Sequence, residues 1–254
     1  MLGALTGDIV GSPYERHPHR SKEFPLFAPG SRPTDDTAMT LAVADALLGD
    51  GDFSSAFRRW FLRYPEAGYG YSFYQWAATP GAPPYGSFGN GSAMRVSPVA
   101  WTHDGLEAVL AAARNTALPT HGHPEGIKGA QATAGAILLA RQQVDPERIR
   151  CWLADTFGYA VDRTVAGIRP RYAFDVTCQG SVPEALICAL EATSFEDALR
   201  NAVSLGGDAD TQAAIAGSVA EARFGVPADI RAEVQARLDS SQLATLTAFE
   251  ARFR

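Results

Sequence analysis

Apolar residues recur at steps of three and four along most of this chain, and that spacing constrains its fold more than any other feature. Between residues 37 and 48, Met39, Ala42 and Val43 fall on one face of a helix. Gly49 follows at a position where helices commonly end. The same spacing predicts further helices over residues 106–114, 127–143, 146–157, 183–192, 195–204, 211–224, 228–238 and 242–253. No convincing run alternates apolar and polar residues as a strand would, so the sequence predicts an all-α fold.

Local start signals support two of these helices. Asp145 stands directly before Pro146, which suits an N-cap followed by proline at the first helical position. Ser181 and Glu184 have the spacing of a capping box, which predicts a helix that begins near residue 183.

Glycine marks two further regions. Gly3, Gly7 and Gly11 recur every four residues, so on a helix they would form a smooth stripe that another helix backbone could approach closely. The stretch 64–95 is rich in glycine, proline and aromatic residues and has little periodicity. It predicts a long loop of the kind that often binds ligands.

Composition limits the class of protein. The 254 residues are 46% apolar and 20% charged, which is ordinary for a globular chain, and we expect a single domain over residues 1–254. The net charge of -6 argues against general nucleic-acid binding, because such proteins usually present a dense basic face. No signal peptide or membrane-spanning run is evident. The three cysteines show no metal-binding spacing and are expected to be buried and reduced, so we predict a cytoplasmic protein.

Two acidic clusters each stand immediately before a predicted helix. The first comprises Thr34, Asp35, Asp36 and Thr37, and the second comprises Asp208, Asp210 and Thr211 after a Gly-Gly pair. Each cluster alone is explained by helix capping, because acidic and hydroxyl groups satisfy the free N–H groups of a first turn. Packed face to face, however, four carboxylates would repel one another unless cations lay among them. Oxygen ligands suit magnesium or manganese, so the paired clusters favour a site for two such ions.

Two glycine-rich segments are candidates for ligand binding. Residues 86–95 could present N–H and hydroxyl donors to a phosphate group without adding positive charge, although they match no nucleotide-binding fingerprint. Residues 68–71 add tyrosine rings that could stack on a base or fill the core. His121 and His123 lack a cysteine partner, so a surface turn explains them better than zinc does.

Taken in order, these motifs resemble the ADP-ribosylhydrolase family over nearly the whole chain. The matching segments are Gly7-Asp8 through Gly11 to Glu15, residues 34–37, Gly89-Asn90-Gly91 through Met94-Arg95, Thr120-His121, and residues 206–211. The resemblance implies a compact, orthogonal multi-helix domain whose two divalent ions, Mg²⁺ or Mn²⁺, lie in a central cleft for ADP-ribose.

The resemblance also implies roles for individual residues. The implied metal ligands are Thr34, Asp35, Asp36, Asp208, Asp210 and Thr211. The implied substrate-binding residues are Gly68, Tyr69, Gly70, Ser87, Phe88, Gly89, Asn90, Gly91 and His121, with the Phe88 ring on adenine. Glu15, on a mobile flap in the serine-directed members, and Asp210 are the candidate catalytic carboxylates.

The activity implied is hydrolysis of the glycosidic bond between ADP-ribose and a protein or small-molecule acceptor, by a protein expected to be a monomer. Residues 174–183 and the pair Ser87-Phe88 look closer to the serine-directed members, which favours O-linked substrates such as serine or O-acetyl-ADP-ribose. Arginine-linked substrates are the alternative. Two other readings are a non-catalytic, crystallin-like binder of ADP-ribose and a two-metal phosphatase that acts on nucleotides.

Overall fold

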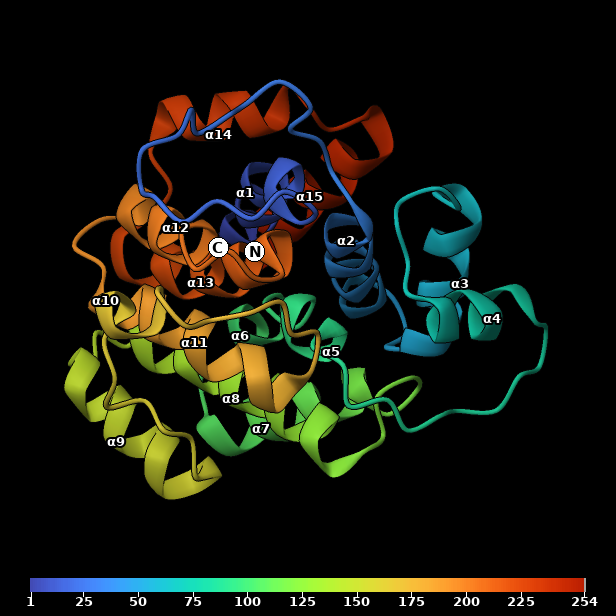
Figure 1. Cartoon of the computed structure of the whole chain (residues 1–254). Coiled ribbons are helices and arrows are strands. Elements are labelled where there is room, and N and C mark those ends of the chain that lie inside the picture. The colour runs from blue at the N-terminus through green and yellow to red at the C-terminus, as the bar shows by residue number, and fades with distance from the viewer. Residues whose placement is uncertain (254) are drawn as a thin grey trace.

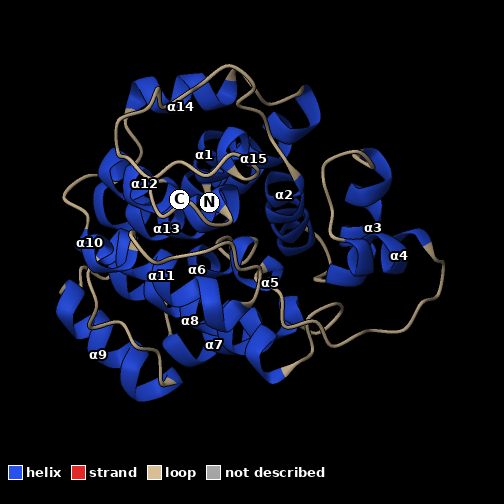
Figure 2. Cartoon of the chain, in the orientation of Figure 1, coloured by secondary structure: helices blue, strands red, loops and turns tan. Residues whose placement is uncertain are grey.

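The computed structural model describes residues 1–253, which are helical apart from their connecting loops and contain no strand (Figure 2). The elements of the first half are α1 (Leu2–Gly11), the 3₁₀-helix η1 (Ser12–Tyr14), α2 (Asp35–Leu48), α3 (Phe53–Arg63), α4 (Tyr71–Ala78), α5 (Gly91–Met94), α6 (Val99–Thr102), α7 (Leu106–Ala117) and α8 (Pro124–Arg141). Those of the second half are α9 (Pro146–Phe157), α10 (Val165–Ile168), α11 (Cys178–Glu191), α12 (Phe195–Val203), α13 (Ala209–Phe224), α14 (Ala228–Gln235) and α15 (Ser240–Phe253). The predicted all-α class is confirmed.

Helix α13 is the central element of the molecule. Every residue from Ala209 to Glu221 is buried, and α1, α8, α11 and α12 all pack against it. Figure 1 shows α1, α12 and α13 together in the middle of the view, with α9 at one side and α3 and α4 at the other. A helix that is buried all round needs small or apolar residues on every face, which the alanine-rich sequence of α13 supplies.

The glycine stripe of α1 is confirmed as a contact surface for α13. A Cβ atom on Gly3, Gly7 or Gly11 would lie 2.1, 1.9 or 2.5 Å from a backbone oxygen of Gly217, Ala213 or Ala209. No side chain fits at those distances, so the backbones of the two helices touch directly. This contact brings the C-terminal end of α1 beside the N-terminal end of α13.

Helix α2 connects this core to the outlying pair α3 and α4. It packs against α1, α3 and α15, and α3 packs in turn against α4 (Figure 1). Neither α3 nor α4 was expected. The loop predicted over residues 64–95 is wrong where α4 and α5 interrupt it, and the rest of that stretch is irregular. Helix α3 carries a recognisable signal, because Asp52 caps it by accepting a hydrogen bond from the N–H of Ser55. Helix α4 depends on tertiary packing, since Phe73 packs against Phe61 and Trp76 is buried.

The start of α11 also differs from the prediction. The helix begins at Cys178 rather than near residue 183, and Thr177 caps it by accepting from the N–H of Gly180. The Ser181 hydroxyl donates back to the Thr177 carbonyl inside the first turn. Pro183 therefore lies within the helix. Ser181 and Glu184 have capping-box spacing, but a threonine four residues earlier performs the capping.

The cysteines are free, but they are not all buried. Cys178 and Cys188 lie in the core, whereas Cys151 is exposed on α9, which corrects the expectation for that residue. Over residues 1–253, no helix combines the length and the apolar character needed to cross a bilayer.

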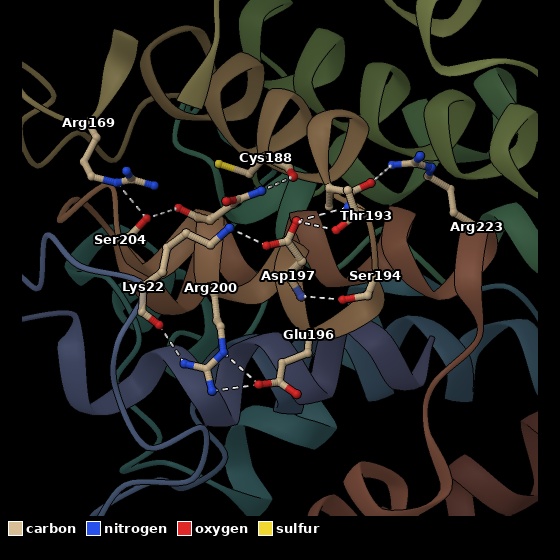
Figure 3. Close-up of polar contacts among 12 residues, drawn as sticks. Lys22, Arg169, Cys188, Thr193, Ser194, Glu196, Asp197, Arg200, Ser204 and Arg223 are labelled. Atoms are coloured by element: carbon tan, nitrogen blue, oxygen red, sulfur yellow. Dashed lines mark hydrogen bonds and ion pairs between the residues drawn. The ribbon is translucent and has the colours of Figure 1, made fainter. Parts of the chain in front are cut away.

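The irregular segment 15–34 is fastened to the molecule by polar contacts (Figure 3). The Arg200 guanidinium donates to the carbonyls of Lys22 and Phe24 at 2.7 and 2.8 Å. Lys22 forms an ion pair with Asp197 of α12. Arg20 donates to the carbonyls of Tyr172 and Leu205. The middle of the segment is thus held against α12, and residues 15–17 lie at the mouth of the cavity described next.

Candidate active site

A cavity of about 800 Å³ opens where the N-terminal ends of α2 and α13 meet. Its walls come from the segments 12–17, 67–73, 85–95 and 174–176, together with His121. The predicted site residues that line it are Glu15, Thr34, Asp35, Asp36, Gly68, Tyr69, Gly70, Ser87, Gly89, Asn90, Gly91, His121, Asp208, Asp210 and Thr211. Phe88 is the predicted residue that does not line it. The fold therefore brings segments far apart in sequence to one cavity.

The floor of the cavity is formed by the two acidic clusters at their helix starts. Thr34 caps α2 by accepting from the N–H of Asp36 at 3.2 Å, and Asp208 occupies the N-cap position of α13. Capping thus accounts for Thr34, but it leaves buried carboxylate oxygen without a partner. The Oδ2 atom of Asp36 accepts no hydrogen bond from any group in residues 1–253.

Asp8 of α1 organises the first cluster, a role that sequence spacing did not reveal. Its fully buried carboxylate accepts from the N–H of Thr34 at 2.9 Å, from the Thr34 hydroxyl at 2.7 Å and from the N–H of Thr37 at 3.0 Å. Since the Thr34 proton points to Asp8, the lone pairs of that hydroxyl face away from it. The family pattern contains Gly7-Asp8, but only the fold shows what Asp8 contacts.

The carboxylates raise one another's pKa values. Burial, and then the charge of Asp8, raises the pKa of Asp35 to about 7. Burial raises the pKa of Asp36 well above its ordinary value, and the charge of Asp210 adds to the effect. The pKa of Asp210 is raised well above its ordinary value by burial and then by Asp208. In residues 1–253 none of these five carboxylates forms an ion pair with a side chain, so no cationic side chain balances the acidic floor.

This donor set fits divalent cations. Carboxylate and hydroxyl oxygens are ligands that Mg²⁺ and Mn²⁺ favour, and a cation would offset the repulsion that raises these pKa values. Asn90 donates to Asp208 Oδ2 at 2.7 Å and so fixes one of the carboxylates. Within the described chain, no three histidine, cysteine or acidic groups already surround a single point. Complete coordination of an ion would therefore require the threonine hydroxyls as ligands or a movement of side chains.

Glu15 lies half-buried at the mouth of the cavity. Its charge contributes to the raised pKa values of Asp35, Asp208 and Asp210, so it lies within electrostatic reach of the floor. In the described part of the chain it forms no ion pair. Glu15 is thus not paired with either of the neighbouring cations, Arg16 and Arg20.

Three N–H groups of the glycine loop 86–91 form hydrogen bonds within the protein. The N–H groups of Ser87 and Asn90 donate to the carbonyls of Thr120 and Val176, and the N–H of Gly89 donates to the Ser87 hydroxyl. These donors were expected to face a phosphate group, but they hold the loop between residue 121 and residue 177 instead. These three bonds anchor the loop as one wall of the cavity.

The aromatic residues near the cavity fall into two groups. Tyr69 stacks on Phe73 and is largely buried, and burial raises the pKa of its hydroxyl. Phe88 is 46% exposed but packs against His123 on the outer side of the loop. Tyr71 and Phe174, by contrast, are 79% and 53% exposed and line the cavity. Sequence reasoning assigned no stacking role to Phe174.

The fold and the cavity together define an all-α protein with a buried acidic centre beside a glycine loop, an arrangement suited to a metal-assisted hydrolase. Comparison with known proteins identifies the family. Residues 1–253 match the family model for ADP-ribosylglycohydrolase, and the chain belongs to that family. Members of this family are glycosidases that act on ADP-ribosyl linkages, so the predicted class of enzyme is confirmed.

Individual relatives agree with this assignment. ADP-ribosylhydrolase ARH3 of Mus musculus is 28% identical over 89% of this chain and 83% of its own length. ADP-ribosylarginine hydrolase Tri1 of Pseudomonas putida (strain GB-1) is also 28% identical, over 89% of this chain and 70% of its own. A solved structure described as an ADP-ribosylglycohydrolase-related protein complex superposes with a TM-score of 0.70 and 26% identity, over 98% of this chain and 95% of that one.

Proposed function

We propose that this protein uses two divalent cations, Mg²⁺ or Mn²⁺, to cleave the glycosidic bond that links ADP-ribose to an acceptor. The observation that carries the proposal is the meeting of Asp35, Asp36, Asp208 and Asp210 on the floor of one cavity with no side-chain cation to balance them. Thr34 and Thr211 supply the hydroxyl oxygens of the ligand set. When bound, the cations would neutralise this charge and hold the hydroxyl groups of the distal ribose.

The residues at the mouth and on the floor meet the needs of glycosidic cleavage. Such bonds break through a state with positive charge on the sugar ring, which nearby carboxylates stabilise. A base must also accept a proton from the attacking water, and a poor leaving group needs a proton. Glu15 and Asp210 both line the cavity and are the candidates for these proton transfers.

We favour O-linked acceptors such as serine or the acetyl group of O-acetyl-ADP-ribose. The support is the likeness of residues 174–183 and of Ser87-Phe88 to the serine-directed members, together with the position of Phe174 and Val176 on the cavity wall. The arginine-directed alternative is supported by the name of the Pseudomonas relative. We further propose that the protein is a cytoplasmic monomer that acts on ADP-ribosylated proteins or small molecules. The free cysteines are consistent with that compartment.

One assay tests the proposal and its alternatives. Purified protein with Mg²⁺ or Mn²⁺ is offered serine-linked, arginine-linked and O-acetyl ADP-ribose, and products are followed by mass spectrometry. We expect intact ADP-ribose, released fastest from the O-linked compounds and not released in excess chelator. Release of AMP would indicate a phosphatase, and tight binding without turnover would indicate a non-catalytic relative. Full activity in chelator would end the two-metal proposal.

A further inference from the structure

Arg95 is a buried cation without a counter-charge beside the cavity. Its side chain is 1% exposed, and its guanidinium lies 4.1 Å from the centre of the Phe57 ring. In the described part of the chain it meets no carboxylate, and its Nε–H has no acceptor. Burial lowers the pKa of this guanidinium to about 10, which leaves it charged at neutral pH. An uncompensated buried charge is costly, so its position on the cavity wall favours an anionic ligand there.

Arg95 is connected to His121 through a single hydroxyl group. Its Nη2 donates to the carbonyl of Thr116 at 3.0 Å and to the Thr120 hydroxyl oxygen at 2.8 Å. The same oxygen lies 2.8 Å from Nδ1 of His121. Thr120 is fully buried.

The Thr120 hydroxyl group determines which ring nitrogen of His121 carries the proton. The hydroxyl has one proton, and residues 1–253 offer it no acceptor other than His121 Nδ1. If Nδ1 carried the proton instead, the oxygen would accept twice and its own buried proton would be left unpaired. Thr120 therefore donates to Nδ1, and the proton of the neutral ring lies on Nε2. Burial, and then the charge of Arg95, lowers the pKa of His121 well below its ordinary value, which keeps the ring neutral.

The protonated nitrogen lies against the glycine loop. A Cβ atom on Gly91 would lie 3.2 Å from His121 Nε2, and one on Gly89 would lie 3.7 Å from it. No group in residues 1–253 forms a hydrogen bond with Nε2, although His121 lines the cavity. The glycine loop thus leaves room for a ligand oxygen at this nitrogen, where a side chain would block it.

We propose that Arg95 and Thr120 are positioning residues that set His121 as a neutral Nε2–H donor to an anionic oxygen of a diphosphate-bearing ligand. The ligand follows from the proposed function, but the proton position does not depend on it. The hydrogen-bonded series from Arg95 through Thr120 to His121 is called the relay. Arg95 supplies positive charge at one end of the relay, and the Thr120 hydroxyl fixes the direction of its hydrogen bonds. The N–H groups of Ser87, Gly89 and Asn90 are bonded within the protein, so the Nε2–H of His121 would add a donor that these three do not supply.

The position of the proton is tested first, in the protein without ligand. A long-range ¹H–¹⁵N correlation spectrum distinguishes the two neutral forms of an imidazole, and His121→Asn identifies the His121 signals among the five histidines. We expect an unprotonated Nδ1 and a protonated Nε2 in the wild type. Thr120→Val removes the donor at similar volume and should populate the Nδ1–H form, whereas Thr120→Ser should restore the wild-type spectrum. A protonated Nδ1 in the wild type would overturn the proposal, whether or not Thr120→Val folds.

Binding is tested by calorimetry with two probes, ADP-ribose and adenosine, which lacks phosphate. Thr120→Val should weaken ADP-ribose binding about tenfold, the effect of losing one hydrogen bond to a charged group, and should leave adenosine binding unchanged. Thr120→Ser should bind ADP-ribose as the wild type does. Equal loss for both probes, or no loss for ADP-ribose, would overturn the role assigned to the relay. If wild-type protein bound no ADP-ribose, the proposed function and this ligand would both fail, while the spectrum would still decide the proton position.

Discussion

Glu15 is the residue whose role most needs a direct test, because it lies at the cavity mouth without an ion-pair partner in the described chain. If its carboxylate moves a proton or supports the leaving group, Glu15→Gln should lower the turnover rate by about a hundredfold or more. Metal and ADP-ribose affinities should change little, since the side chain keeps its shape. Turnover and binding are measured on the same sample. Near-normal turnover would exclude Glu15 from the chemistry and leave Asp210 as the candidate base.

The aromatic partner of the adenine base is a second question at this scale. Sequence resemblance predicts Phe88, but Phe174 is the exposed phenylalanine that lines the cavity. A base stacked on an aromatic ring gains about 1–3 kcal/mol, so Phe174→Ala should weaken ADP-ribose binding by about tenfold to a hundredfold. Phe88→Ala is the matched control and should have a smaller effect, measured by calorimetry. The reverse order of effects would restore the stacking role of Phe88.

At the scale of elements, the direct contact between α1 and α13 positions the floor of the site. A Cβ atom on Gly7 would lie 1.9 Å from the Ala213 carbonyl oxygen, so Gly7→Ala must force the helices apart. We expect a loss of about 1–3 kcal/mol or more in the free energy of unfolding, as overpacked cores show. Because Asp8 adjoins Gly7 and bonds to Thr34, metal binding should weaken as well.

Urea denaturation measures this loss, and Gly105→Ala provides the control. Gly105, the N-cap residue of α7, has an ordinary backbone conformation and no atom within 4 Å of the Cβ position, so its substitution should cost only the N-cap preference for glycine over alanine, under about 1 kcal/mol. Equal stability of the two variants would show that α1 and α13 can separate at little cost.

At the scale of the whole molecule, the buried charge on the floor predicts that divalent ions stabilise the fold. Ions that bind only the folded state at a hundred times their Kd add about 2.7 kcal/mol to the free energy of unfolding. Thermal unfolding with and without Mg²⁺ or Mn²⁺ should therefore show a rise in Tm. In Asp36→Ala the rise should be largely lost and activity nearly abolished, because a carboxylate ligand is missing. A wild-type Tm that does not change with either ion would contradict the proposed metal ligands.

Local signals predicted much of the fold. Helix α9 runs over Pro146–Phe157 as expected, because its Asp145 cap, its proline and its periodicity all lie within a few residues of one another. Helix α4 was missed because its aromatic residues form a helix only when packed against Phe61 of α3. The loop 86–91 was recognised, but its bonds to Thr120 and Val176 involve residues distant in sequence.

The sequence by itself determined the helical class, the two acidic helix starts and the family pattern, since each depends on short-range spacing. Only the tertiary structure decided that these starts share one cavity, that Asp8 organises the first of them and that Arg95 reaches His121 through Thr120. The physical reason is distance along the chain. Capping and periodicity act within a few residues, whereas the repulsion of buried carboxylates and the direction of a hydrogen-bond relay arise only when packing brings remote segments together.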